Sequence, residues 1–134
     1  MNLNIQHLSQ EVNGEITITG SKSESNRLLV LQALYPQIKI QNLSNSDDSR
    51  ITQKGLKSKS NIIDINHAGT AMRFLTAYFA IQPHREIILT GSKRMQERPI
   101  KLLVDSLNSL GANITYKKEI GFPPLIIKGK KIKD

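Results

Sequence analysis

Cysteine is absent from the 134 residues of this chain, which excludes a disulfide framework, a thiol nucleophile and a thiolate metal site. Three scattered histidines make a poor zinc cluster, so metal-free chemistry is favoured. No apolar run approaches the roughly 20 residues that a membrane-spanning helix needs. The N-terminus also lacks a basic start followed by an apolar core. The sequence therefore predicts a cytoplasmic protein with no metal and no membrane partner.

Aromatic residues are scarce, at 4% of the chain, although the net charge is +8. Many lysines fall in residues 54–59, at Lys117 and Lys118, and in the last seven residues, which is typical of solvated edges. Nucleic-acid binding usually needs aromatic rings among the basic residues for base stacking, and these are missing. A basic nucleic-acid-binding or interaction module is therefore the alternative function, and nucleic acid is not the expected partner.

The length and the hydrophobic content of 38% fit one compact domain. At its start, Asn13-Gly14 separates two extended stretches, Leu3–Leu8 and Glu15–Thr19. Asn-Gly is typical of a hairpin turn because both turn positions need positive φ. Residues 1–19 are therefore expected to form an opening β-hairpin, and residues 20–134 to alternate between strands and helices.

The stretch Gly20–Arg27, GSKSESNR, joins the second strand of this hairpin to an apolar run, Leu28–Leu34. A helix that begins near Ser21 leaves backbone N–H groups unpaired and carries partial positive charge at that end, which suits an anion. Ser23 and Arg27 are four residues apart, so their side chains share one helix face. Ser21 with Glu24 is also a capping box, which needs no ligand. Both interpretations remain open on these residues alone.

The following residues predict a buried helix, a strand, a helix and another strand. The helix through Leu34 is apolar almost all round and ends before Pro36. Gln37–Leu43 has the pattern of a short strand. Ser46 with two acids after it predicts the cap of a second helix, which ends near Lys57. Asn61–Ile65 is predicted to be another strand.

The stretch His67–Arg73, HAGTAMR, repeats the first arrangement of a strand, a small-residue turn and a helix with an early arginine. The N–H groups of Gly69 and Thr70 open this helix and can meet a carboxylate or phosphate. Arg73 lies off the predicted buried face, which consists of Ala71, Phe74, Leu75, Tyr78 and Phe79. A plain glycine turn with a surface arginine explains the same residues.

The last third of the chain repeats the pattern once more. A strand at Arg85–Thr90 precedes GSKRMQERP, in which Arg98 comes directly before Pro99, and proline favours the first helical position. The apolar face of the helix is predicted at Ile100, Leu103, Val104, Leu107 and Leu110, with Gly111 as its stop. Asn113–Tyr116 and Pro124–Lys128 are predicted to form a closing strand pair.

This alternation indicates an α/β or α+β fold. Basic residues stand at three separate helix starts, and three such coincidences favour a site for a small molecule with several negative charges. Two arginines and a lysine from different segments suit a ligand that carries both phosphate and carboxylate.

Several motifs, in the same order, resemble those of the EPSP synthase family: GSKSESNR, NSDDSR, HAGTAMRFLTA, TGSKRMQERPIKLLVDSLNSLGA and the PPL of residues 123–125. The resemblance spans Gly14 to Gly129. It implies transfer of the enolpyruvyl group of phosphoenolpyruvate to the 5-hydroxyl of shikimate 3-phosphate, with release of phosphate and no cofactor. It also implies βαβαββ-type units with helices inside and sheets outside.

The resemblance also implies roles for individual residues. Lys22 would touch both substrates and assist proton transfer or departure of the leaving group. Ser23 and Arg27 would hold shikimate 3-phosphate. The phosphoenolpyruvate pocket would be formed by Gly69, Thr70 and Arg98, with Arg73 bracing the loop.

The chain departs from the family pattern at several points. His67 stands where the family usually has asparagine, and Phe74 where it has proline. The connection over residues 57–65 is shorter than usual. The family has two similar domains, and residues 1–134 correspond to only part of the N-terminal one, without its carboxylate base. We therefore expect a truncated version of the fold that needs the remaining part of the same enzyme as its partner and is inactive alone.

Overall fold

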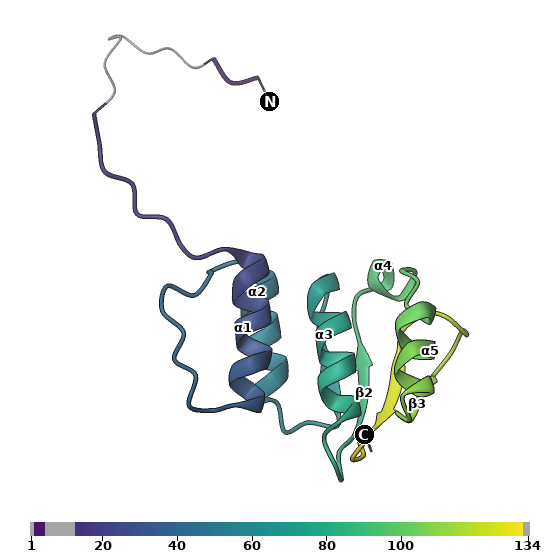
Figure 1. Cartoon of the computed structure of the whole chain (residues 1–134). Helices are drawn as coiled ribbons and strands as arrows, with labels where there is room; N and C mark the ends of the chain where they lie inside the picture. Colours follow the sequence, from purple (N-terminus) through teal and green to yellow (C-terminus); the bar gives the residue numbers. More distant parts are fainter. Residues whose placement is uncertain (1, 5–12, 133–134) are drawn as a thin grey trace.

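The computed structural model of the chain describes residues 2–4 and 13–132. It has five helices and four strands in this described part: α1 (Lys22–Leu34), α2 (Asp47–Lys57), β1 (Ile62–Asp64), α3 (Gly69–Ala80), β2 (Glu86–Thr90), α4 (Lys93–Gln96), α5 (Lys101–Ser109), β3 (Ile114–Tyr116) and β4 (Leu125–Lys128). This mixed architecture confirms the predicted α/β class (Figure 1). Among the described helices, none is long and apolar enough to cross a membrane.

Residues 62–128 form one complete βαβαββ unit, in the order β1, α3, β2, α5, β3 and β4, with the short α4 inserted before α5. The sheet order is β1-β2-β4-β3. β1 pairs with β2 in parallel, with Ile63 opposite Leu89. β4 pairs antiparallel with both β2 and β3, and Ile127 lies opposite Ile87 and Ile114. The predicted closing strand pair is therefore confirmed.

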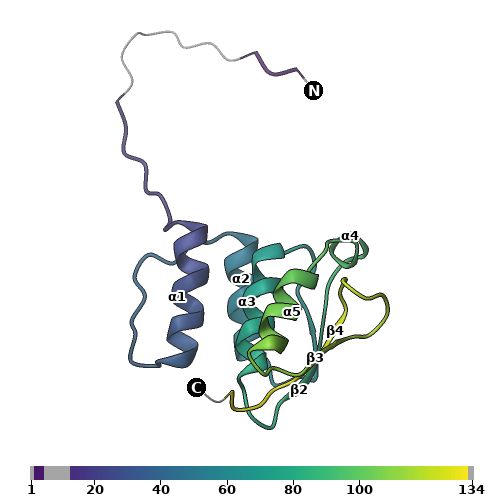
Figure 2. The ribbon, with the colours of Figure 1, turned by 45° about the vertical axis from the view of Figure 1, so that its right-hand side comes forward.

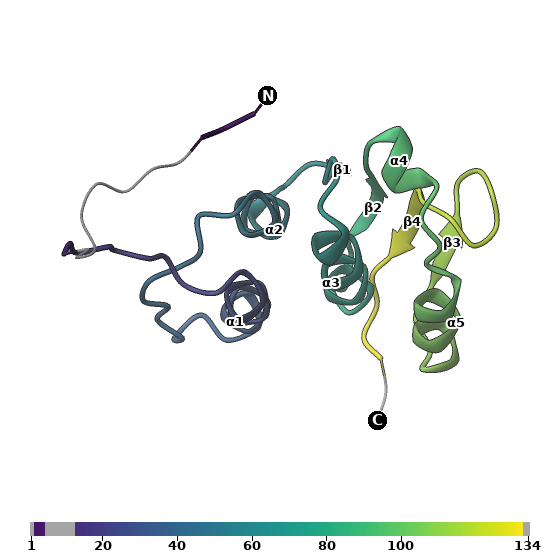
Figure 3. The same cartoon turned by 90° about the horizontal axis from the view of Figure 1, so that it is seen from above.

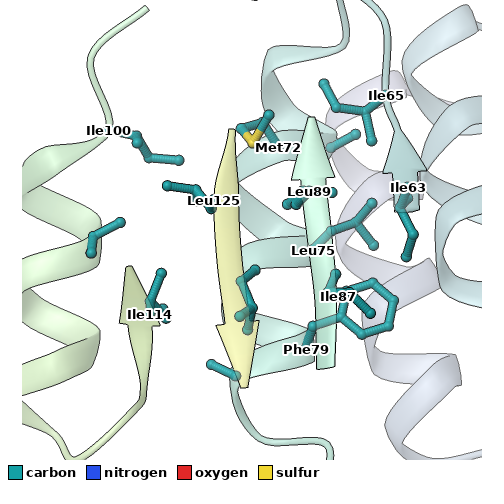
Figure 4. Packing of buried hydrophobic residues seen from close by; sticks show 14 of the residues in the cluster. Ile63, Ile65, Met72, Leu75, Phe79, Ile87, Leu89, Ile100, Ile114 and Leu125 are labelled. Carbon is teal, nitrogen blue, oxygen red and sulfur yellow. The ribbon is translucent and has the colours of Figure 1, made fainter. Parts of the chain in front are cut away.

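One face of this sheet is buried and the other is solvent-exposed or only partly covered. Side chains alternate along β2, where Ile87 and Leu89 are buried and Glu86 is exposed. Helices α3 and α5 cover the buried face, as the view from above shows (Figure 3). Leu75 and Phe79 of α3 pack there against the strands (Figure 4). Because successive side chains of a strand point to opposite faces, Ile87 and Leu89 both face the helices.

Helices α1 and α2 lie beyond α3, on the side away from the sheet, and contact each other and α3 (Figures 2 and 3). The bounds of α2 agree with the prediction, and Ser46 caps it by accepting a hydrogen bond from Ser49 N at 3.3 Å. The prediction that α1 is buried on most sides is wrong. Its buried residues are Ser25, Asn26 and Leu29, whereas Leu31 is 43% exposed. The physical reason is that α2 and α3 pack on one side of this helix and leave Leu31 and Leu34 more than a third exposed.

Two predicted strands before β1 are also wrong. Glu15–Thr19 forms no strand, and its Ile16 and Ile18 side chains are 85% and 75% exposed. Most of its expected hairpin partner, Leu3–Leu8, lies outside the described residues. Gln37–Leu43 forms a turn and an irregular connection, with Asn42 at a φ of 51°. Neither segment has a neighbouring strand in the described part of the chain, and an apolar pattern alone cannot supply one.

The start of α5 differs from the prediction as well. Pro99 precedes the N-cap residue Ile100, so it is not the first helical residue, because α4 and a turn occupy the preceding residues. Ile100 and Val104 are buried as expected, but Leu110 is 65% exposed. Gly111, with a φ of 98°, ends the helix as predicted.

Candidate anion-binding site

One pocket of about 370 Å³ brings together residues from three separate segments of the chain. Its lining consists of Ser23, Arg27, Gly69, Thr70, Arg73, Phe74 and Arg98. Six of these seven are residues that the sequence predicted for an anion site. Helices α1 and α3 begin at the same end of the molecule, where α4 also lies (Figure 1). The pocket therefore lies where two helix N-termini and the loop before α5 meet.

The first two turns of α1 supply Ser23 and Arg27. Ser21 is the N-cap, and its Oγ accepts a hydrogen bond from Glu24 N at 3.4 Å. Arg27 Nη1 donates to the carbonyl oxygen of Ser23 at 2.9 Å, which keeps both residues on one helix face. The cap and the pocket lining thus coexist, so the capping interpretation of this stretch does not exclude the ligand-binding one.

The first two turns of α3 supply Gly69, Thr70, Arg73 and Phe74. No side chain caps this helix, since its N-cap residue is Ala68. Arg73 Nη1 donates to the carbonyl oxygen of Gly69 at 3.1 Å, and its Nη2 donates to that of Pro99 at 3.4 Å. Arg73 therefore links the start of α3 to the loop that carries Arg98.

Arg98 reaches the pocket from the loop between α4 and α5. Its guanidinium lies against Gly69, where an added Cβ would overlap Nη1 and Cζ. It also lines a second, adjacent cleft of about 560 Å³, together with His67, Arg94 and Met95. Two signals could have identified this cleft: His67 departs from the family pattern, and Arg94 precedes Arg98 by four residues. Four lining residues of the two pockets were not assigned to the anion site from the sequence: His67, Phe74, Arg94 and Met95.

Lys22 is not among the residues that line the pocket. It is the first residue of α1 and its side chain is exposed. Consecutive helical residues point about 100° apart, so Lys22 does not share the face of Ser23. Its predicted contact with both substrates remains a prediction.

The pocket has an excess of positive charge. Two ion pairs occur in the described part of the chain, Lys101 with Asp105 and Lys128 with Glu86 at 3.4 Å, and neither involves a pocket arginine. Carboxylates are also absent from the lining residues. Within residues 2–4 and 13–132, no group of histidines and carboxylates could hold a metal ion. Three guanidinium groups around helix N-termini suit a ligand with more than one negative charge.

An apolar groove of about 520 Å³ adjoins the pocket and shares Arg27 and Phe74 with it. Its other lining residues come from α1, α3, α5 and the C-terminal segment: Val30, Leu31, Leu34, Ala77, Tyr78, Ile81, Leu107, Leu110 and Ile132. Several of them are more than a third exposed, including Leu31, Leu34, Ile81 and Leu110. The groove is therefore an apolar surface that the described chain leaves open.

Comparison with known proteins gives a consistent set of matches. The model of the family described as EPSP synthase (3-phosphoshikimate 1-carboxyvinyltransferase) matches residues 7–58 and 52–134. A 3-phosphoshikimate 1-carboxyvinyltransferase of Bacteroides fragilis is 46% identical over 123 residues, which cover 91% of this chain and 30% of the relative. The enzyme of the same name from Haemophilus influenzae is 42% identical over 151 aligned positions, covering 91% and 35%. The chain thus spans about a third of the length of these relatives.

The two alignments differ in length although they cover the same share of this chain. The difference of 28 positions (151 − 123) corresponds to insertions in the Haemophilus relative that the Bacteroides relative lacks. The two matched pieces of the family model meet at residues 52–58, next to the connection that is short here.

A solved structure of EPSP synthase from Acinetobacter baumannii superimposes with a TM-score of 0.71, covering 87% of this chain and 32% of that one. At 21% sequence identity this similarity is evidence for the fold alone.

Proposed function

This chain belongs to the EPSP synthase family, and we infer from this premise that it supplies one half of the active site of a 3-phosphoshikimate 1-carboxyvinyltransferase. In this reaction, the 5-hydroxyl of shikimate 3-phosphate loses its proton and its oxygen bonds to C2 of phosphoenolpyruvate, while C3 gains a proton to give a tetrahedral intermediate. Phosphate then leaves from C2 as C3 loses a proton and the C2–C3 double bond forms again. One observation carries the proposal. Six residues from three segments, each expected to bind an anionic substrate, line a single pocket.

The starts of α1 and α3 and the loop before α5 have different proposed roles. Ser23 and Arg27 bind shikimate 3-phosphate, because a hydroxyl and a guanidinium on one helix face can bind the same anion. The N–H groups at the start of α3, at Gly69 and Thr70, bind phosphoenolpyruvate together with Arg98. Arg73 holds the Arg98 loop against α3. The guanidinium groups stabilise the negative charge that develops on the departing phosphate.

Lys22 is the last of the proposed substrate-binding residues. It is also the proposed catalytic residue in the half of the active site that this chain supplies. Its exposed side chain stands at the start of α1, next to Ser23. An ammonium group near the bridging oxygen would assist proton transfer or departure of phosphate. In this proposal Lys22 turns toward the substrates when both are bound.

The remaining part of the same enzyme is the proposed partner, and the chain is a partial N-terminal substrate-binding domain. Two features support this. The apolar groove between α1, α3 and α5 exposes Leu31 and Leu110, and Ile16 and Ile18 are exposed on an extended segment. Contiguous apolar surfaces of this kind commonly mark interfaces. The lining of the anion pocket also contains no carboxylate to serve as a base, so the chain alone is proposed to be inactive.

The cytoplasm is the proposed location, since both substrates are soluble phosphorylated metabolites. Amino-acid biosynthesis through chorismate, by the shikimate pathway, is the proposed process.

An amide NMR titration of the chain with shikimate 3-phosphate tests the proposed binding site. We expect saturable shifts at the starts of α1 and α3 and at Arg98. Arg27→Ala should weaken binding at least about tenfold, since a hydrogen bond to a charged group contributes about 1.5–3 kcal/mol. Arg50→Ala, at an exposed position of α2 outside the pocket, is the matched control. Equal losses in the two variants would contradict the proposal.

A salt series in the same titration separates this function from nucleic-acid binding. A nucleic-acid module would bind a short oligonucleotide with an affinity that falls steeply with salt and depends on many lysines. Binding of shikimate 3-phosphate to a single site should instead depend on Arg27 at every salt concentration.

Complementation tests the proposed partner. We expect the part of the Bacteroides fragilis enzyme beyond its matched third to bind this chain when the two are produced together. Leu31→Lys, in the groove, should abolish the complex and any phosphate release. Leu102→Lys, at a leucine that is 85% exposed and lies outside the groove, is the control. Sustained phosphate release by the chain alone would overturn the proposal that it is inactive without a partner.

A further inference from the structure

Phe74 lies at the boundary between the anion pocket and the apolar groove, because it lines both. It was predicted to lie on the buried face of α3, at a position where the family usually has proline, and its side chain is half-buried. Arg27 lines the same two surfaces and packs on this ring, with Cζ 5.6 Å from the ring centroid. Two residues from different helices thus form a common wall between a charged pocket and an apolar one.

The position of the Arg27 guanidinium depends on few contacts. Nη1 donates to the carbonyl oxygen of Ser23, within its own helix, and the Phe74 ring is the contact from α3. Neither ion pair of the described residues includes Arg27. A guanidinium carries five N–H donors, so donors remain for a ligand after the Ser23 bond is made.

An aromatic ring holds a guanidinium differently from a carboxylate. The attraction is between the cation and the ring quadrupole, so the charge is not neutralised. The ring also takes none of the N–H donors that a phosphate would need. A carboxylate in the same place would compete with the ligand for both the charge and the donors. An aromatic contact is therefore suited to fixing an arginine that must stay available to an anion.

We propose that Phe74 is a positioning residue for Arg27: its ring holds the guanidinium at the wall of the pocket and so raises the affinity of the site for phosphate. The inference rests on the proposed function for its biological meaning. Its physical content, that the ring orients the arginine, is independent of the reaction.

The first test needs no substrate. The ring current of Phe74 should shift the Nε–H signal of Arg27, and Phe74→Leu should move that signal toward the position of a free arginine. Phe74→Tyr keeps a ring and should retain the shift. Phe122→Leu, at another half-buried phenylalanine outside the pocket, should leave the Arg27 signal unchanged. An Arg27 signal that is the same in parent and Phe74→Leu would overturn the proposal.

The second test measures affinity for inorganic phosphate by NMR titration. Phe74→Leu should weaken binding about two- to fivefold, the range for a partly exposed cation–π contact. Phe74→Tyr should bind like the parent. In an Arg27→Gln background, Phe74→Leu should have no further effect, because the ring then has no guanidinium to hold. An equal loss in both backgrounds would mean that Phe74 acts through general packing, which would overturn the proposal.

Phe74→Met fills a similar volume without a ring and replaces the leucine variant if that variant loses the fold.

The proposed function and the positioning role of Phe74 can be contradicted separately. If shikimate 3-phosphate does not bind but the Arg27 signal depends on Phe74, the proposed function fails and the positioning role stands. If the substrate binds and the signal does not depend on Phe74, only the positioning role fails.

Discussion

The guanidinium of Arg98 occupies the space beside Gly69 that a Cβ on that residue would need, so any side chain there would overlap Nη1. Gly69 is the first residue of α3, and Arg98 is in the loop before α5. Glycine is required here by a side chain packed against it rather than by a positive φ. The close approach brings the arginine to the N-terminus of α3, where backbone N–H groups are free of side-chain caps.

Gly69→Ala should displace Arg98 without unfolding the chain. The overlapping atoms are the far end of a flexible side chain, which can move, so we expect the free energy of unfolding to change by less than about 1 kcal/mol. Phosphate affinity should fall about as much as in Arg98→Ala, because both changes remove the guanidinium from the pocket. Urea denaturation and NMR titration measure the two effects. Phosphate affinity equal to that of the parent would contradict the contact.

Gly20→Ala should destabilise the chain, in contrast to Gly69→Ala. A Cβ on Gly20 would overlap the backbone carbonyl of Asn42, which cannot move as a side chain can. We expect a loss of about 1–3 kcal/mol in the free energy of unfolding, the usual range for overpacking. Gly14→Ala, where a Cβ would meet nothing within 4 Å, is the matched control and should change stability little. Similar urea midpoints for the two variants would contradict the prediction.

Local signals in the sequence predicted the helices well. Ser46 with the two acids after it gave the bounds of α2, and Gly111 gave the end of α5, because caps act within one turn. The strands of the βαβαββ unit were also predicted, because each is a short, mainly apolar segment between turn residues. These features depend on residues close in sequence, which is where sequence patterns are most informative.

The errors lie where the outcome depends on a distant neighbour. Gln37–Leu43 and Glu15–Thr19 have strand-like patterns, but strand formation needs a partner, and the described chain offers them none. The apolar residues of α1 predicted burial on most sides, yet Leu31 and Leu34 face an open groove. Both errors have one physical cause. An apolar pattern shows which residues of a segment can be buried, but contacts with the rest of the fold determine whether they are buried.

The candidate site was predicted as a set of residues rather than as a geometry. Helix starts with basic residues identified Arg27, Arg73 and Arg98 separately, and their meeting in one pocket required the packing of α1 on α3. The contact between Arg98 and Gly69 depends on the turn after α4, which the placement of Pro99 at the helix start had missed.

Arg85→Lys should destabilise the chain, because Arg85 anchors the short connection between α2 and β1. Its Nη2 donates to the carbonyl oxygens of Ser58 and Ser60, both at 3.2 Å, and its guanidinium lies 5.6 Å from the centre of the Phe79 ring. Lysine keeps the charge but has no planar fork. We expect a loss of about 1–2 kcal/mol in the free energy of unfolding. Hydrogen exchange should also become faster in the connection.

Arg50→Lys is the matched control for this change, since Arg50 is exposed on α2. It should leave both the urea midpoint and hydrogen exchange near residue 60 as they are in the parent. If the two lysine variants unfold at the same urea concentration, Arg85 does not anchor the connection.

Tyr116 should make stability depend on pH in the alkaline range. Burial, followed by the negative charge of Asp105, raises the pKa of Tyr116 above its ordinary value of 10.0. Its hydroxyl is buried and has no hydrogen-bond partner among residues 2–4 and 13–132, so a phenolate there would lack solvation. A raised pKa in the folded state means that the folded state binds the proton more tightly. The resulting stabilisation is fully present below about pH 10 and is lost as the pH rises through the raised pKa.

Tyr116→Phe should remove this dependence. At pH 7, loss of an unpaired buried hydroxyl should leave the free energy of unfolding unchanged or raise it by up to about 1 kcal/mol. Above pH 10, the phenylalanine variant should unfold at higher urea than the parent, with the difference growing as the parent's Tyr116 ionises. Tyr35→Phe, at a side chain that is 54% exposed, should follow the parent throughout, because its hydroxyl is in water in both states. A Tyr116→Phe variant that is less stable than the parent at pH 7 would mean that the hydroxyl has a partner. If the urea midpoints of the parent and of both variants change with pH in the same way above pH 10, Tyr116 ionises as easily in the folded state as in the unfolded state.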